Sequence, residues 1–391
     1  MNPVLLATLI ATAMPQDTTA APWDSLARFL DASIASRAFP GAVVAVGRHD
    51  TVLYLHAFGH LDYEHGQRVT TRTVYDLASL TKVVGLTTAM MRLVEEGRVA
   101  LDTPAVHYVP AFRDSAVTVR QLLTHSSGLP AWRPFWQQVH SRAEMFALVD
   151  AEPLEQPPHT KMVYSDLGAM VLTQIVETVT GERLDRYLQV HLFRPLGMRN
   201  TRYLPPASWR SRIAPTEMDT TYRHRLIRGE VHDENAASMG GISGHAGLFS
   251  TAPDLVKFAQ MLLRNGRTDA RTHARTGMRG HGDTGARGRG GAANQLVDSA
   301  TVAMFTTVQD PAFSSRALGW DTPSKGSSAG DELSPRAFGH TGFTGTSIWI
   351  DPAKDLFVIL LTNRVYPTRQ NDQILRVRPR VADLAAEAAK R

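Results

Sequence analysis

Hydrophobic positions at the two ends of the chain predict the same kinds of element in mirrored order. The N-terminal part carries leucine, phenylalanine and isoleucine at helical spacing and then two strand-like apolar runs, which we place at 23–36, 42–46 and 52–56. The C-terminal part shows two strand-like runs and then a helical pattern, at 347–350, 356–362 and 372–389. We therefore expect one antiparallel sheet built from both ends of the chain and covered by the two terminal helices.

The middle of the chain, roughly residues 80–300, shows mostly helical periodicity and loops. We expect it to form a helical lobe inserted into the sheet domain, so the predicted fold class is α+β. Segment 264–292 is rich in glycine, arginine and threonine and has few apolar side chains. Such a segment cannot bury enough surface to offset its ordering entropy, and we predict a disordered basic insertion there.

The composition excludes several classes of protein. The chain has 391 residues, of which 43% are hydrophobic and 20% charged, as in ordinary globular proteins. Its formal net charge of +5 arises in segment 264–292, which holds seven arginines and two aspartates, so nucleic acid is not an expected partner. Cysteine is absent, which excludes disulfides and thiolate chemistry. No apolar run approaches the ~20 residues that span a bilayer, so stable membrane insertion is not expected.

The N-terminus resembles a secretory signal peptide. Residues 3–14 form a largely apolar run, residues 11–13 give the small-residue pattern of a cleavage site, and a polar linker follows. The first two residues include no lysine or arginine, which departs from that pattern. We interpret 1–22 as a signal peptide and linker and 23–391 as one domain, and we expect the protein to be exported.

Ser79 and Lys82 form an S-x-x-K motif at the start of a predicted helix, which Gly97 ends. Their spacing of three residues places both side chains on one face of the helix. A serine hydroxyl becomes a nucleophile when a base takes its proton, and the N–H groups of a helix N-terminus suit a developing oxyanion. An isolated S-x-x-K more often marks a capping serine beside a solvated lysine, so the motif needs support from elsewhere in the chain.

Two further motifs supply that support. Tyr164-Ser165-Asp166 directly precedes a predicted helix, and His340-Thr341-Gly342 begins the strand that we expect to lead into 347–350. Alone, the first would be a tyrosine before an aspartate cap and the second a glycine-rich strand entry. In this order and spacing, the three motifs resemble the serine β-lactamase and penicillin-binding family, specifically its class C β-lactamase-like branch. The resemblance covers about residues 24–365 and implies an active site in a cleft between a sheet lobe and a helical lobe, with no metal and no cofactor.

The resemblance also implies a role for each matched residue. Ser79 would be the acylated nucleophile, Lys82 would assist its deprotonation, and Tyr164 would shuttle protons in acylation and deacylation. Backbone N–H groups of Ser79 and Phe343 would form the oxyanion hole. The remaining substrate-binding and oxyanion-hole positions are expected at His340, Thr341, Gly342 and Asp166.

Two positions depart from the β-lactamase pattern, because His340 stands where the family has lysine and Asp166 where it has asparagine. We expect these changes to make the cleft more negative. A carboxylate beside Lys82 would favour its ammonium form and shift the work of the base toward Tyr164, and it would also raise the pH at which His340 loses its proton. A more negative cleft would also hold anionic β-lactams and D-Ala termini less well, and we therefore rank hydrolysis of D-amino-acid peptides or esters above true β-lactamase activity.

His232, Asp233 and Glu234, together with His245, have side chains that can bind metals. We interpret them as packing and hydrogen-bonding residues of loops near the cleft.

The sequence therefore predicts an exported bacterial serine hydrolase, periplasmic or secreted, that works through an acyl-enzyme. We expect it to be D,D-peptidase-like and to act on peptidoglycan-type peptides or related amides and esters. A carboxylesterase is the near alternative, β-lactamase is third, and a non-catalytic sensor of peptidoglycan or β-lactams is the alternative from another class. The expected partner is a small-molecule or peptidoglycan-peptide substrate, and the oligomeric state stays open.

Overall fold

The computed structural model describes residues 22–268 and 294–390. The expected signal peptide and linker at 1–22, apart from its last residue, and most of the expected insertion at 264–292 lie outside the described residues. Within the described part of the chain, no helix is long and apolar enough to cross a bilayer.

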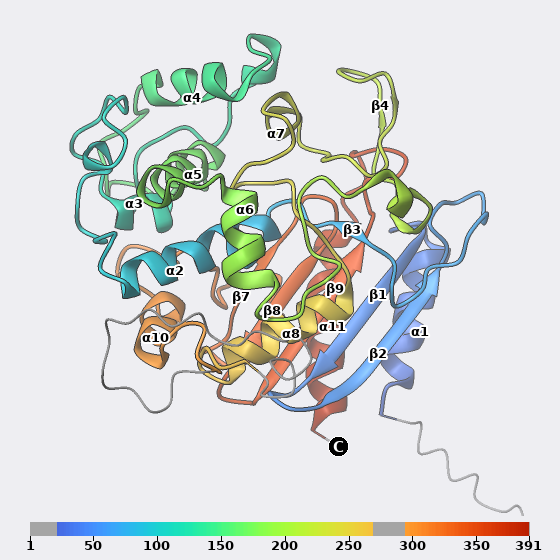
Figure 1. Ribbon diagram of the computed structural model, residues 1–391. Helices are drawn as coiled ribbons and strands as arrows, with labels where there is room; N and C mark the ends of the chain where they lie inside the picture. The colour runs from blue at the N-terminus through green and yellow to red at the C-terminus, as the bar shows by residue number, and fades with distance from the viewer. Residues whose placement is uncertain (1–21, 269–293, 391) are drawn as a thin grey trace, which may run out of the picture.

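Five strands form one antiparallel sheet in the spatial order β2-β1-β9-β8-β7 (Figure 1). Their bounds are Gly41–Gly47 for β1, Val52–Gly59 for β2, Phe338–Thr341 for β7, Ser347–Asp351 for β8 and Leu356–Thr362 for β9. β1 from the N-terminal part pairs with β9 from the C-terminal part, so that Val44 lies opposite Leu360. The predicted sheet built from both ends of the chain is confirmed.

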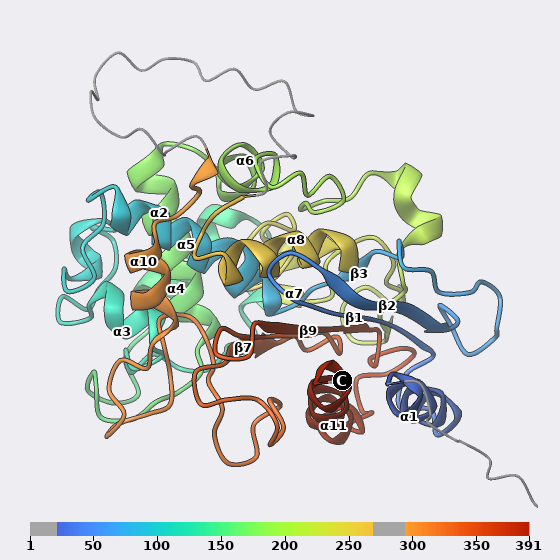
Figure 2. The same ribbon diagram turned by 90° about the horizontal axis from the view of Figure 1, so that it is seen from below.

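Helices cover both faces of this sheet (Figure 2). The terminal helices α1 (Asp24–Ala35) and α11 (Ile374–Ala389) lie side by side on one face, and α8 (Ala252–Leu263) lies on the other. Alternating side chains of β1 enter the two cores, because Val44 packs with the terminal helices and Val43 packs with α8. Both faces of the central strands are therefore buried.

Most of the remaining chain forms the helical lobe, which confirms the predicted α+β class. Its longer helices are α2 (Thr88–Glu95), α4 (Arg142–Ala151), α5 (Asp166–Thr180) and α10 (Ser299–Thr306). Its shorter helical elements are η1 (Lys82–Thr87), η2 (Ala105–His107), α3 (Val119–Leu123), η3 (Phe135–Gln137), α6 (Leu184–Leu188), η4 (Gln189–Phe193), η5 (Ala207–Arg212) and α7 (Glu234–Ser238). Two-residue strands pair as β3 (Tyr75–Asp76) with β6 (Phe249–Ser250) and as β4 (Met218–Asp219) with β5 (Arg225–Leu226).

The prediction for the strand around His340 is wrong in one respect. His340 and Thr341 do not begin the strand at 347–350 but end a separate strand, β7, which pairs with β8. The chain reverses between them because Gly342 N–H donates to the carbonyl oxygen of Thr346 at 2.8 Å and Gly345 adopts a φ of +116°. Only glycine readily takes that left-handed conformation.

Candidate active site

The turn that carries Ser79 connects β3 to the helix formed by η1 and α2. Ala78 has a φ of +47°, a conformation that costs a residue with a Cβ about 1 kcal/mol or more. The carboxylate of Asp76 stabilises this turn, because Oδ1 accepts from the Ala78 N–H at 2.8 Å and Oδ2 accepts from the His232 N–H at 2.7 Å. Ser79 is thereby presented at the start of the helix, where the sequence placed it.

Lys82 lies one turn further along, and its side chain is only 4% exposed. Its Nζ lies close to three oxygen atoms, at 3.0 Å from Oγ of Ser79, 3.1 Å from the carbonyl oxygen of His245 and 2.6 Å from Oδ1 of Asp166. Burial opposes the charge on Lys82, but the carboxylate of Asp166 outweighs burial and raises the pKa of Lys82 above its ordinary value. Lys82 is therefore an ammonium group held against the serine hydroxyl.

Tyr164 and Asp166 enter the site from the start of α5. The cap of this helix is Ser165 rather than the aspartate, since its Oγ accepts from the Gly168 N–H at 3.2 Å. The ring of Tyr164 lies with its centroid 4.9 Å from Nζ of Lys82, and its hydroxyl has no hydrogen-bond partner among the described residues. Burial raises the pKa of Tyr164, although the Lys82 ammonium opposes this effect. The phenol is thus protonated at neutral pH.

The end of β7 forms the opposite wall. His340 is buried, and its Nδ1 donates to the carbonyl oxygen of Thr341 at 2.8 Å, so Nε2 carries the lone pair. Burial, together with the positive charges of Arg316 and Lys82, holds the pKa of His340 well below its ordinary value. Our expectation that Asp166 raises the pH at which His340 loses its proton is therefore wrong: burial and cations dominate, and His340 is neutral.

The turn between β7 and β8 is fastened to the Ser79 turn. Thr344 Oγ1 donates to the carbonyl oxygen of Asp76 at 2.8 Å, and Thr346 Oγ1 donates to that of Leu77 at 3.0 Å. Gly342 permits this approach, because a Cβ there would lie 2.3 Å from the Leu77 carbonyl oxygen. Among the described residues, neither the Ser79 nor the Phe343 backbone N–H donates a hydrogen bond, so both are available to an oxyanion.

A pocket of about 400 Å³ opens beside Ser79. Besides the motif residues it is lined by Arg316, Asp321, Phe343, Arg364, Asp372, Ile374, Leu375 and Arg378. The three arginines come from a loop after α10, from the turn after β9 and from α11, and none belongs to the motifs around Ser79, Tyr164 and His340. They supply positive charge that the motif positions lack, in a lining that also holds Asp321 and Asp372.

The arginines differ in how they are held. Arg378 is buried and donates from Nη2 to the carbonyl oxygens of Gly342 at 2.5 Å and Thr346 at 3.0 Å, and burial beside Arg364 lowers its pKa to about 9. Arg364 donates from Nε to the Phe343 carbonyl oxygen at 2.7 Å. Arg316 is 12% exposed, and its Nη1 has no hydrogen-bond partner among the described residues. Nε of Arg378 also lacks a partner among the described residues, but Arg378 and Arg364 already donate to the backbone around Phe343, and we find no such bond from the described side chain of Arg316.

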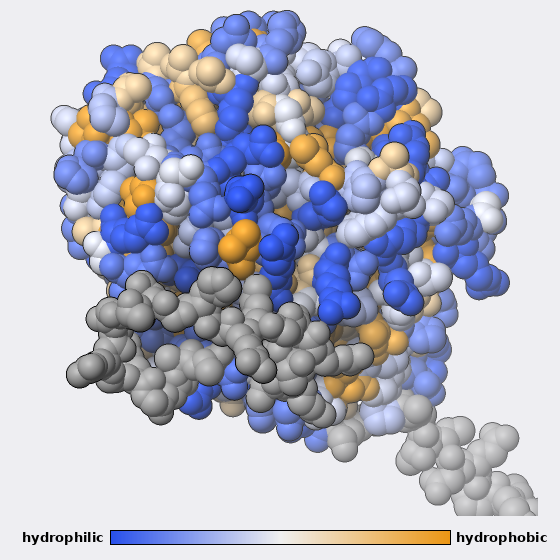
Figure 3. Space-filling model, viewed as in Figure 1, coloured by the Kyte–Doolittle hydropathy of each residue, from blue (hydrophilic) through white to orange (hydrophobic). Residues whose placement is uncertain are grey.

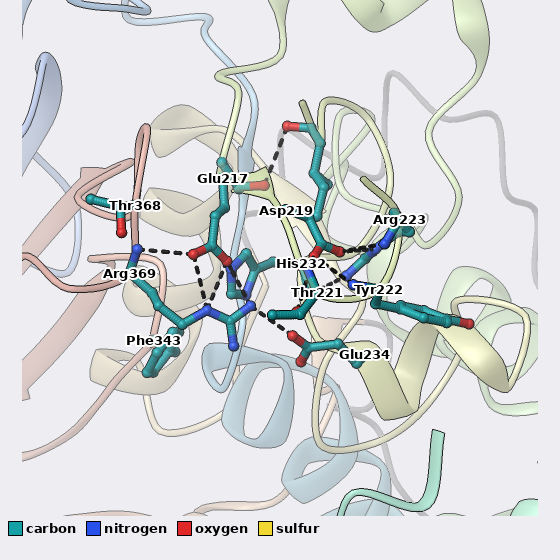
Figure 4. A network of polar contacts seen from close by, with 12 residues as sticks. Glu217, Asp219, Thr221, Tyr222, Arg223, His232, Glu234, Phe343, Thr368 and Arg369 are labelled. Atoms are coloured by element: carbon teal, nitrogen blue, oxygen red, sulfur yellow. Dashed lines mark hydrogen bonds and ion pairs between the residues drawn. The ribbon is translucent and has the colours of Figure 1, made fainter. Parts of the chain in front are cut away.

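A network of ion pairs supports the rim of the site beyond Phe343 (Figure 4). Nη2 of Arg369 lies 2.6 Å from carboxylate oxygens of both Glu217 and Glu234, and Nε2 of His232 lies 2.8 Å from Oε2 of Glu217. Despite burial, His232 and Arg369 lower the pKa of Glu217 to about 2. The ring of His232 stacks on Phe343 with centroids 5.6 Å apart. This network was not foreseen, since sequence spacing gives no sign that Glu217 and Arg369 meet.

The side chains considered for metal binding take other partners. His232 and Glu234 belong to the ion-pair network, whereas Nε2 of His245 lies 2.8 Å from Oδ1 of Asp233. Within residues 22–268 and 294–390, no group of three or more histidine, aspartate or glutamate side chains is arranged to hold a metal ion. The hydrogen bonds and ion pairs of these four residues are the contacts that we expected of loop residues near the cleft.

Ser79 and Lys82 thus meet one helical turn apart beside this pocket, an arrangement suited to the chemistry of a serine hydrolase. The Beta-lactamase family model matches residues 26–382, and the chain belongs to this family.

Known relatives and solved structures agree with this assignment. A protein of Escherichia coli (strain K12) named "Putative D-alanyl-D-alanine carboxypeptidase" is 32% identical over 372 residues, covering 83% of this chain and 79% of the relative. A penicillin-binding protein homologue from Caulobacter crescentus has a TM-score of 0.71 at 20% identity, covering 94% of this chain and 97% of the homologue. EstCE1, a hydrolase with promiscuous acyltransferase activity, has a TM-score of 0.67 at 20% identity, and the match covers 92% of this chain and 98% of EstCE1. At these identities the two structures support the fold.

Proposed function

We propose that the protein is a D,D-carboxypeptidase that releases a C-terminal D-amino acid from peptidoglycan-type peptides through an acyl-enzyme. Ser79 is the nucleophile in this proposal, and the free N–H groups of Ser79 and Phe343 hold the oxyanion. The name of the Escherichia coli relative supports the substrate class.

The observation that carries the proposal is the group of arginines in the pocket beside Ser79. A carboxypeptidase must bind the terminal carboxylate of its substrate next to the bond that it cleaves. Guanidinium groups bind carboxylates well because their N–H donors match the two carboxylate oxygens. Arg316 is the arginine with an unpartnered Nη1, so we assign it the substrate carboxylate, while Arg364 and Arg378 hold the backbone around Phe343.

A carboxylesterase is the second candidate, and a different observation favours it. Phe343 and Leu375 line the same pocket and are 48% and 66% exposed, so they offer apolar surface to an acyl or alkoxy group. An ester substrate of this kind needs no carboxylate. A penicillin does carry one, so we expect acylation by penicillins, with β-lactamase activity third because it also requires fast hydrolysis of that acyl-enzyme.

We also propose that the protein acts outside the cytoplasmic membrane of a bacterium, where peptidoglycan peptides are found. The N-terminal resemblance to a signal peptide supports this location. Cell fractionation of a tagged full-length chain tests it, because retention of the uncleaved chain in the cytoplasm would contradict export.

The test of the activity compares two peptides that differ in one charge. The chain is incubated with a diacetylated L-Lys-D-Ala-D-Ala peptide and with the same peptide bearing a C-terminal amide, and released D-alanine or D-alaninamide is measured by mass spectrometry. We expect kcat/KM for the free carboxylate to exceed that for the amide by about tenfold or more, the ratio expected from about 1.4 kcal/mol of differential binding. Equal values with rapid hydrolysis of a p-nitrophenyl ester would instead favour the esterase.

A further inference from the structure

The surroundings of Lys82 leave it without a free lone pair. Three oxygens surround its Nζ, and one of them is Oγ of Ser79, which accepts from the ammonium rather than giving up its own proton. The raised pKa of Lys82 agrees with this geometry. An ammonium group in this position can stabilise an alkoxide but cannot take the serine proton until it has lost one of its own.

The neighbouring side chains do not supply another ready base at the serine. Tyr164 is a protonated phenol, since burial raises its pKa. His125 accepts from the Ser165 N–H through Nδ1 at 3.1 Å, so that lone pair is engaged. His340 has an unpartnered Nε2, but its ring packs against Tyr164, with centroids 5.7 Å apart, and its hydrogen bond is to the Thr341 carbonyl oxygen rather than to Ser79.

Asp166 differs from all of these groups. Its Oδ1 lies 2.6 Å from Nζ of Lys82 and, apart from this ion pair, has no hydrogen-bond partner among the described residues. The carboxylate is only 19% exposed, so water competes weakly for it. It is an anionic acceptor within proton-transfer distance of the ammonium.

We propose that Asp166, acting through Lys82, is the terminal acceptor of the Ser79 hydroxyl proton. Lys82 passes one proton from Nζ to Oδ1 of Asp166 and takes the proton of Ser79 Oγ as that oxygen forms its bond to the substrate carbonyl carbon. The carbonyl electrons move onto the oxyanion, Lys82 remains an ammonium, and Asp166 becomes a neutral acid. When the tetrahedral intermediate collapses, the proton returns through Lys82 and leaves on the departing nitrogen or oxygen.

This inference rests on the proposed serine hydrolase function and assigns a task to the position where the family pattern has asparagine. The charged and titratable groups that act on the Lys82–Asp166 pair come from several elements: Tyr164 before α5, His125 after α3, Asp233 before α7, His340 on β7 and, through Tyr164 and His340, Arg316. Lys82 is the group in contact with both the serine and the carboxylate.

The experiment measures acylation of the full chain by a p-nitrophenyl ester as a function of pH, in the wild type and in Asp166→Asn. The variant keeps the shape of the side chain but cannot accept a proton. We expect the acidic limb of the acylation rate to move up by at least one pH unit in Asp166→Asn, because Lys82 must then lose its proton to solvent, with a loss of about tenfold or more at pH 6. Asp166→Glu keeps a carboxylate and should keep the acidic limb near the wild-type position.

A second measurement gives a decisive result on the wild type, which does not depend on whether a variant folds. The wild-type acylation rate is measured in mixtures of H2O and D2O, where two protons in flight give a curved dependence on the deuterium fraction and one proton gives a straight line. We expect the acylation rate to depend on the deuterium fraction along a curve in the wild type and along a straight line in Asp166→Asn. A straight line for the wild type, or an unchanged acidic limb in Asp166→Asn, would overturn the proposal.

The matched control is Glu177→Gln. Glu177 also lies on α5, is also 19% exposed and also pairs with a cation, Arg142. This variant should keep the wild-type pH profile of acylation and the curved dependence of the acylation rate on the deuterium fraction. Labelling of Ser79 by a fluorophosphonate distinguishes failure of the proposed serine hydrolase function from failure of the proposed role of Asp166. Absence of labelling would contradict the serine hydrolase function. Normal labelling with an unchanged pH profile in Asp166→Asn would contradict only the role of Asp166.

Discussion

The hydroxyl of Thr346 donates to the backbone carbonyl oxygen of Leu77 across 3.0 Å, which fastens the β7–β8 turn to the segment that presents Ser79. The two residues are far apart in the sequence, since Leu77 lies between β3 and η1 and Thr346 lies between β7 and β8. Because Phe343 lies in this turn, the bond fixes the distance between the two N–H groups that we assign to the oxyanion.

Removal of that bond should therefore affect turnover more than it affects stability. Thr346→Val keeps the shape of the side chain and should lower the free energy of unfolding by about 1–2 kcal/mol, the effect of losing one buried hydrogen bond. We expect kcat to fall by about tenfold or more, as for a misplaced oxyanion donor, with little change in KM. Thr88→Val is the control, since its hydroxyl is equally buried and donates to the Val83 carbonyl oxygen at 3.0 Å. Equal losses of kcat in both variants would contradict the positioning role.

Gly342→Ala should disrupt the contact between the β7–β8 turn and the Ser79 turn by steric overlap. A Cβ at this position would lie 2.3 Å from the Leu77 carbonyl oxygen and 2.1 Å from Oγ1 of Thr346, so the two turns must separate. We expect a loss of about 2 kcal/mol or more in unfolding free energy, measured by urea denaturation, and a strong loss of ester hydrolysis. Gly66→Ala is the control, because its nearest neighbours would lie 3.7 Å away. An active and stable Gly342→Ala protein would show that the close contact is not needed.

Arg316 should govern the preference for substrates that carry a carboxylate. Arg316→Met removes the charge while keeping much of the side-chain length, and we expect kcat/KM for the peptide with a free carboxylate to fall by about tenfold or more. The value for the amidated peptide should change little. Arg183→Met, at an exposed arginine outside the pocket, serves as the control. A parallel loss on both peptides would mean that Arg316 supports the fold rather than the carboxylate.

Acid should destabilise the protein through its buried histidines. Burial lowers the pKa of both His125 and His340 well below 6.5, so below that pH the unfolded chain binds protons that the folded chain does not. The free energy of unfolding should therefore decrease as the pH falls from about 7 to 5, by up to about 1.4 kcal/mol per pH unit for each histidine. Urea denaturation at several pH values tests this, and His340→Gln should flatten the slope. A slope unaffected by this change would show that His340 titrates normally.

The lowered pKa of His340 also has a consequence for substrate binding. Since His340 is neutral over this range, the KM of an anionic substrate should not rise as the pH passes 6.5, and Arg316 should hold the substrate carboxylate instead.

Much of the fold could be predicted from local patterns. The apolar runs that became β1, β2, β8 and β9 are long and strongly hydrophobic, and the terminal helices have clear periodicity. β7 was misplaced because it is only four residues long and contains Gly339 and His340, which do not give a strand pattern. Its identity as a strand depends on pairing with β8, which local sequence does not reveal.

Only the site residues that belong to short sequence motifs could be predicted. Ser79 and Lys82 meet because a helix brings residues three apart together, and Tyr164 and Asp166 come from the next motif. The arginines of the pocket lie on three unrelated elements, so their convergence is a property of the tertiary structure. The neutral state of His340 likewise follows from burial and from Arg316, neither of which a sequence pattern contains.

Every step proposed for this site depends on a covalent acyl-enzyme at Ser79. Intact-protein mass spectrometry after exposure to a fluorophosphonate and, separately, to a penicillin tests it most directly, with digestion to locate the modified residue. We expect one adduct per chain on the peptide that contains Ser79, and no adduct in Ser79→Ala under the same conditions. An adduct that persists in Ser79→Ala, or one located on another residue of the wild type, would show that Ser79 is not the nucleophile.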